Sequence, residues 1–145
     1  DWSSDVCSSD LVIKTCAINM LPGAPPLDDT KAYFARMADA IRARGARVIY
    51  GTCVPVSRGY DRGEGDGHVT ERVSAFNTWV REESRRTQSP LLDYAAALGD
   101  AQGYLPDALS DDGLHPNAEG RRRMLDAIRA VVVEGVVHGA GGAPR

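Results

Sequence analysis

The segment ARVIYGT, Ala46–Thr52, is the clearest strand signal in this 145-residue chain. It is a short apolar run rich in β-branched residues, and it has the length of a buried strand. The residues before it have a different period, because apolar side chains recur at the i, i+3, i+4 and i+7 spacing of one helix face. These are Phe34, Met37, Ala38 and Ile41. The chain therefore passes from helix to strand at this point.

Two further strands are predicted on either side, at Leu11–Ala17 and Pro90–Asp93, from their short apolar runs. The first helix is expected to start at a cap formed by Asp28 and Asp29 and to end near Gly45.

Two more amphipathic helices follow. The apolar face of the earlier one is predicted to hold Val69, Val73, Phe76 and Val80. Asn117 can cap the later one. Its apolar stripe runs through Met124, Leu125, Ile128, Val131 and Val132.

The order of elements is strand, helix, strand, helix, strand, helix. Apolar strands that alternate with helices predict an α/β fold with a parallel sheet covered by helices on both faces. Right-handed crossovers then bring three loops to the carboxyl edge of the sheet, where such folds bind their ligands. These loops open at Ala17, open at Cys53 and end at Pro116.

Length and composition exclude several classes. The chain is the size of one domain, and 43% apolar residues supply a core. Seventeen Lys and Arg against twenty Asp and Glu give a net charge of -3, so we expect no nucleic-acid partner. No apolar run approaches the roughly 18 residues that a membrane span needs.

The two ends differ from the rest of the chain. Residues 1–10, DWSSDVCSSD, show neither helical nor strand periodicity and resemble translated adapter sequence, so we predict an artefactual or disordered head. Residues 11–136 are predicted to form the domain. Residues 137–145, rich in Gly and Ala, are predicted to form a flexible tail.

The glycine-rich segment Cys53–His68 is predicted to be a mobile, solvated loop. Its acidic residues and His68 fit neither an EF-hand nor a zinc pattern, so no metal or cofactor is expected. Three cysteines, Cys7, Cys16 and Cys53, are too few for a disulfide scaffold. A bridge between Cys16 and Cys53, or a nucleophilic role for either, stays open.

The segment SDDGLHPNAEG, Ser110–Gly120, carries the most informative chemistry. Asp112 and His115 lie three residues apart, and a carboxylate this close to an imidazole can fix its tautomer and stabilise its protonated form. The pair would then be half of a triad that activates a nucleophile. A plain turn built from Asp, Gly, Pro and Asn is the alternative.

This segment resembles the last conserved block of the SGNH, or GDSL-type, hydrolases, in the form D-G-L-H-P-N-x-x-G. The likeness extends to ARGARVIYGTCVPV and SPLLDYAAAL, and spans residues 12–133. It implies a flavodoxin-like three-layer α/β/α sandwich, with Asp112 as the acid and His115 as the base of a serine-ester hydrolase.

The segment TCAINM, Thr15–Met20, stands where that family has its Gly-x-Asn-Asp block. The resemblance implies that the side-chain amide of Asn19 donates to the oxyanion. Ala17 and Met20 depart from the pattern. Asn19 acting only as a turn residue is the alternative.

The family's Gly-Asp-Ser block is missing from the sequence, so the chain holds no matching nucleophile. We therefore expect an N-terminally truncated domain that is inactive alone and self-associates through an unpaired strand edge. The substrate implied is a small-molecule ester of a carbohydrate or lipid. Alternatives are a catalytically degenerate module that binds a glycan or acyl ligand, and a response-regulator or nucleotide-binding fold. The latter is disfavoured because no Gly-rich phosphate loop follows a strand.

Overall fold

The computed structural model describes residues 10–64 and 66–139. Its centre is a parallel three-stranded sheet in the order β1-β2-β3. The strands are β1 (Asp10–Ile13), β2 (Arg47–Gly51) and β3 (Leu91–Leu92). Val12 pairs with Ile49, and Tyr50 pairs with Leu91.

Helices connect the strands and follow the last one. They are α1 (Leu27–Arg42), α2 (Arg58–Gly63), α3 (Val69–Arg86), α4 (Tyr94–Leu98) and α5 (Ala118–Gly139), with 3-10 turns η1 (Ala17–Met20) and η2 (Asp107–Leu109). None of the helices in the described part of the chain is long and apolar enough to cross a bilayer.

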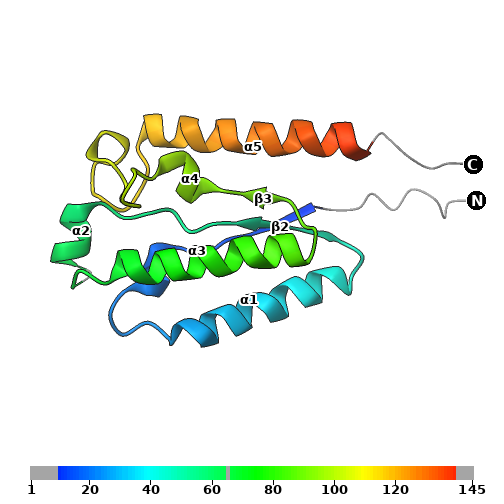
Figure 1. Ribbon diagram of the computed structural model, residues 1–145, viewed down its shortest axis with the longest axis horizontal. Coiled ribbons are helices and arrows are strands. Elements are labelled where there is room, and N and C mark those ends of the chain that lie inside the picture. Colours follow the sequence, from blue (N-terminus) through cyan, green and yellow to red (C-terminus); the bar gives the residue numbers. More distant parts are fainter. Residues whose placement is uncertain (1–9, 65, 140–145) are drawn as a thin grey trace, which may run out of the picture.

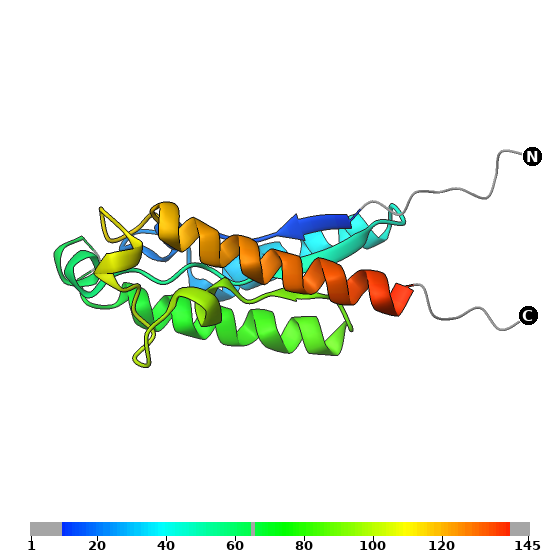
Figure 2. The same cartoon turned by 90° about the horizontal axis from the view of Figure 1, so that it is seen from above.

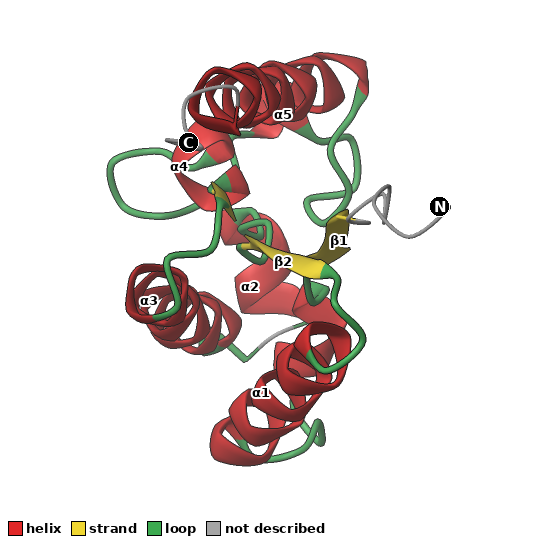
Figure 3. Ribbon diagram, turned by 90° about the vertical axis from the view of Figure 1, so that its right-hand side faces the viewer, coloured by secondary structure: helices red, strands yellow, loops and turns green. Residues whose placement is uncertain are grey.

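The elements form three layers, as the α/β/α sandwich requires. Helices α1 and α3 cover one face of the sheet, and α5 with α4 covers the other (Figure 3). Figure 2 shows α5 running lengthwise over the sheet. The predicted fold class, a parallel sheet between two helical layers, is therefore confirmed.

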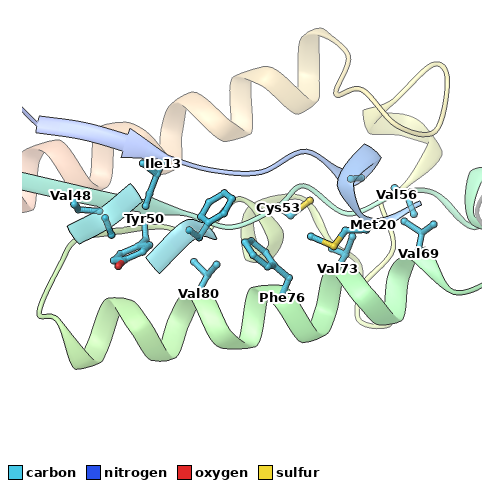
Figure 4. Close-up of a cluster of buried hydrophobic side chains, with 13 residues drawn as sticks. Ile13, Met20, Val48, Tyr50, Cys53, Val56, Val69, Val73, Phe76 and Val80 are labelled. Atoms are coloured by element: carbon cyan, nitrogen blue, oxygen red, sulfur yellow. The ribbon is translucent and has the colours of Figure 1, made fainter. Parts of the chain in front are cut away.

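Each face of the sheet has its own apolar core. The core under α1 and α3 includes Val48, Tyr50 and Phe76 (Figure 4). The Phe34 ring meets the Phe76 ring edge to face, with centroids 5.1 Å apart. Full burial of such a side chain contributes about 1.5–3 kcal/mol to folding. On the other face, Leu98 and its neighbours pack against α5.

All three strands point toward one end of the molecule. The turn η1, the helix α2 and the loop before α5 lie together at that end (Figure 1). The carboxyl edge thus gathers the three loops that the sequence places there.

The N-terminal elements differ from the prediction. The strand expected over Leu11–Ala17 ends at Ile13, and the chain turns into η1 because both Ala17 and Met20 bury their side chains. The predicted head, 1–10, overlaps β1, because Asp10 is the first residue of that strand. The Asp10 carboxylate also accepts two hydrogen bonds from the Arg47 guanidinium. The rest of that head, residues 1–9, lies outside the described residues.

Two other boundaries also differ. Asp28 and Asp29 do not cap α1. They lie in its first turn, where their charges still favour the helix dipole. The predicted tail, 137–145, begins inside α5, which continues to Gly139; residues 140–145 lie outside the described part. Asn117 does cap α5, because its side-chain oxygen accepts from the backbone N–H groups of Glu119 and Gly120, both at 3.1 Å.

The segment predicted as a mobile loop contains α2 and a buried carboxylate. Asp61 is only 1% exposed and accepts from the backbone N–H of Val69 at 2.9 Å and of Thr70 at 3.4 Å. It therefore satisfies the first N–H groups of α3. A glycine-rich composition predicted flexibility, but this contact fixes α2 to the start of α3.

Candidate active site

Asp112 and His115 contact each other on the loop before α5. Oδ2 of Asp112 lies 2.7 Å from Nδ1 of the His115 ring. Oδ1 of the same carboxylate accepts from the backbone N–H groups of Leu114 at 2.9 Å and His115 at 2.7 Å. One oxygen thus shapes the turn while the other holds the ring, so both contacts of the carboxylate form within the local sequence D-G-L-H.

The electrostatics of this pair favour a charged carboxylate. The backbone N–H of His115, followed by its ring and the backbone N–H of Leu114, holds the pKa of Asp112 well below its usual range. A carboxylate that stays ionised keeps the Nδ1 proton of His115 in place. The ring is 69% exposed, and in the described part of the chain nothing hydrogen-bonds its Nε2 atom. This nitrogen is the one free to take a proton.

Two serines that the sequence analysis did not single out as positioning groups support this loop. The hydroxyl of Ser110, which is buried, donates to the carbonyl oxygen of His115 at 2.8 Å and lies 3.2 Å from Oδ1 of Asp112. From outside, the backbone N–H of Ser57 donates to the carbonyl oxygen of Gly113 at 2.7 Å. Ser110 could have been found from its place two residues before an Asx turn. The Ser57 contact has no local sequence signal.

Asn19 lies in η1, just beyond β1, and its side chain is exposed. Its Nδ2 atom donates to Oγ1 of Thr15 at 2.7 Å, and its backbone N–H donates to the carbonyl oxygen of Cys16 at 3.0 Å. Thr15 and Asn19 also line a cavity of about 370 Å³ beside α1, together with Tyr33 and Phe34.

The turn η1, which contains Asn19, and the loop before α5, which contains Asp112 and His115, lie at the same end of the sheet (Figure 1). Within the described residues, no hydrogen bond joins Asn19 to either of them. The candidate site thus has two parts on separate loops of the carboxyl edge, Asn19 on one and the Asp112–His115 pair on the other.

Cys16 and Cys53 form no disulfide bridge, and the surroundings of Cys53 disfavour a nucleophilic role for that thiol. Cys16 and Cys53 are both free. Burial raises the pKa of Cys53 to about 12, so its thiolate, the reactive form, is strongly disfavoured. Cys7 lies outside the described residues.

The acidic loop likewise does not gather a metal site. Among residues 10–64 and 66–139, no group of three or more His, Cys, Asp or Glu side chains could hold a metal ion. Asp61 is engaged with α3, and the His68 ring lies 3.6 Å from the Glu71 carboxylate.

Solved structures with the same fold include proteins described as acylhydrolases, lipases or esterases, and also the OSK domain of Drosophila Oskar. A protein from Bacteroides fragilis assigned as an acylhydrolase is 21% identical with a TM-score of 0.74, and a GDSL-like lipase from Bacteroides thetaiotaomicron is 20% identical with a TM-score of 0.67. In both, 88% of this chain is covered. An acetyl-xylooligosaccharide esterase from Geobacillus is 16% identical with a TM-score of 0.67, covering 90% of this chain.

This chain spans less than two thirds of these neighbours, namely 62%, 62% and 64% of their lengths. Among curated proteins, no sequence matches it significantly. The sequence profile of the GDSL-like lipase/acylhydrolase family matches residues 2–123, starting within the head that the sequence analysis sets apart. The match spans most of the chain and both halves of the candidate site, and the protein therefore belongs to the GDSL-like lipase/acylhydrolase family.

Proposed function

We propose that this chain supplies the acid, the base and one oxyanion donor of a serine-ester hydrolase. The observation that carries this proposal is the 2.7 Å contact between Oδ2 of Asp112 and Nδ1 of an exposed His115 ring whose Nε2 atom has no hydrogen-bond partner among the described residues. This is the geometry that a general base needs in order to accept a proton from a nucleophile.

The reaction proceeds in two halves. Nε2 of His115 takes the proton of a serine hydroxyl as the serine oxygen attacks the carbonyl carbon of the ester. The second N–H of the Asn19 amide donates to the oxygen that becomes negative, an interaction worth about 3–4 kcal/mol in such sites. His115 then gives the proton to the leaving alcohol, and water repeats the sequence to release the acid. Asp112 remains ionised and holds the Nδ1 proton throughout.

We further propose that the attacking serine comes from a segment beyond the described residues. The hydroxyl of Ser57 accepts from Tyr60, that of Ser84 donates to the carbonyl oxygen of Ser89, and that of Ser110 bonds the His115 carbonyl. In the described part of the chain, no serine hydroxyl bonds the His115 ring. Because the sequence also lacks the family's Gly-Asp-Ser block, we expect the chain to be inactive alone.

The substrate is proposed to be a small-molecule ester. Family membership supports an ester bond, and the acetyl-xylooligosaccharide esterase among the structural neighbours supports testing acetylated carbohydrates beside lipid-like esters. A panel of p-nitrophenyl esters from acetate to longer chains separates a small acyl site from a lipase-like one.

The experiment compares this chain with a longer version in which the family's Gly-Asp-Ser segment precedes Leu11. The longer version is expected to hydrolyse p-nitrophenyl acetate, and His115→Ala should lower its rate by about 10³-fold or more. His68→Ala is the matched control, because its side chain is 73% exposed, close to the 69% of His115, and lies outside the pair. Turnover by the short chain would exclude an external serine. A His115→Ala variant that keeps its rate would exclude the triad.

A second candidate is a degenerate binding module, which Met20 favours. This side chain is 1% exposed and packs in the core, at the position where the family pattern has an aspartate. Equilibrium binding of acetylated sugars by the longer version without turnover would support this function over hydrolysis.

A further inference from the structure

We propose that Thr15 is a positioning residue that aims the Asn19 amide, and this inference rests on the proposed role of Asn19. The hydroxyl oxygen of Thr15 accepts one N–H of the Asn19 side chain at 2.7 Å. A primary amide has two N–H groups. With one held by Thr15, the orientation of the other is fixed.

Because the Thr15 side chain is buried, its hydroxyl is the less mobile group in the hydrogen bond with Asn19. Ile13, Thr15 and Ala17 are all buried, whereas the residues between them are exposed. Thr15 is 4% exposed and therefore occupies an inward position that suits an apolar β-branched side chain. A hydroxyl placed there costs free energy unless it is hydrogen-bonded, and its strongest partner is Asn19.

The Thr15 side chain rotates less freely than the Asn19 side chain, and this difference indicates which of the two orients the other. Asn19 is exposed, so its carboxamide would rotate freely without a partner. Thr15 is buried and β-branched, and such side chains are stiff at χ1. Its own proton lies toward the carbonyl oxygen of Cys16, 3.5 Å away, which leaves a lone pair for the Asn19 N–H. Thr15 is therefore the anchor, and Asn19 is the group that is oriented.

Orientation matters because an oxyanion donor acts only when it already points at the place where charge develops. The backbone N–H of Asn19 is also held, by the carbonyl oxygen of Cys16 at 3.0 Å. Main chain and side chain are thus fixed within a single turn. The free N–H of the amide is presented at the carboxyl edge without a further ordering cost.

Thr15→Val and Thr15→Ser form a matched pair for the test. Valine keeps the shape of the buried side chain and removes the hydroxyl, whereas serine keeps the hydroxyl. In the full chain, NMR is expected to show one slowly exchanging Asn19 side-chain N–H. Thr15→Val should speed its solvent exchange about tenfold, and Thr15→Ser should not. Equal melting temperatures show that the variants remain folded. An unchanged Asn19 amide in Thr15→Val would overturn the proposal.

The longer version with the serine segment gives the functional measurement. Thr15→Val should lower kcat about tenfold with KM unchanged, and Thr15→Ser should restore it. In an Asn19→Ala background, Thr15→Val should have no further effect, because both changes remove the same interaction. Independent losses would overturn the proposal. If no version shows activity, the proposed function fails, while the NMR result still decides how the amide is held.

Discussion

The backbone N–H of Ser57 donates to the carbonyl oxygen of Gly113, 2.7 Å away, and so ties the start of α2 to the loop between Asp112 and His115. Ser57 is buried, and its hydroxyl also accepts from the backbone N–H of Tyr60 at the first turn of α2. One residue thus caps a helix and holds the candidate catalytic loop. The position of that loop at the carboxyl edge therefore depends on a segment more than 50 positions earlier in the chain.

Gly113→Ala is expected to displace this loop. Gly113 has a φ of +78°, and a Cβ there would collide with Oγ of Ser57 and lie 3.0 Å from Cβ of Tyr60. The positive φ costs about 1–3 kcal/mol, and overpacking adds about 1–3 kcal/mol. Chemical denaturation should therefore show a larger loss than in Gly103→Ala, whose φ is +83° but whose Cβ would meet nothing within 4 Å. Equal losses would mean that the contact with Ser57 is unimportant.

Acid should weaken the wild-type fold partly through Asp112. Hydrogen bonds, first from the backbone N–H of His115, lower the pKa of Asp112 from its ordinary value of 3.8 in the folded state. A carboxyl with a lowered folded pKa contributes stability above its unfolded pKa and loses it as pH falls toward the folded value. The gap in unfolding free energy between wild type and Asp112→Asn should therefore narrow below about pH 4. Denaturant titrations from pH 7 to pH 2 measure it, and a constant gap would contradict the assignment.

Asp61→Ala is expected to destabilise α3. Its buried carboxylate accepts from the first two N–H groups of that helix, and loss of such a cap costs about 0.5–2 kcal/mol. Asp61→Asn keeps an acceptor oxygen and should lose less. Asp29→Ala is the control, because Asp29 sits in the first turn of α1 without capping it. Thermal melts that rank Asp29→Ala as the more damaging change would refute this role for Asp61.

The edge of β1 is expected to cause self-association. In the described sheet β1 pairs only with β2, and Leu11 and Val12 are 47% and 50% exposed. An open apolar edge strand is a template for pairing with a second chain. Val12→Lys should shift sedimentation profiles toward monomer. Ile18→Lys, which changes a more exposed residue outside any strand, should not. A wild-type chain that sediments as a monomer would exclude the edge as an association site.

Local patterns predicted the layered part of the fold well. The strand at Arg47–Gly51 lies within the predicted Ala46–Thr52, because a short run containing Val48 and Ile49 and flanked by glycines favours a strand over a helix. The prediction of element boundaries was weaker where contacts between distant parts of the chain decide the local structure. Thr15 and Ala17 are buried at alternate positions as in a strand, yet the chain has already left β1. Helix α2 depends on the buried Asp61, which composition alone could not reveal.

The candidate site divides in the same way. Asp112 and His115 are three residues apart, so their contact follows from a single turn and was predicted. Ser57 supports that turn through a contact that exists only after folding, and nothing in its neighbourhood predicts it. Thr15 was overlooked because its hydroxyl looks like an ordinary strand residue until the following turn brings Asn19 over it.

The acid and the base are held together by bonds that begin and end within one hexapeptide, Ser110–His115. These contacts set the distance between Asp112 and His115 locally, whereas the bond from Ser57 to Gly113 sets where their loop lies relative to α2. Changes of length in other surface segments are therefore expected to leave the contact between Asp112 and His115 in place. Such changes would instead alter the orientation of this loop relative to η1, where Asn19 lies.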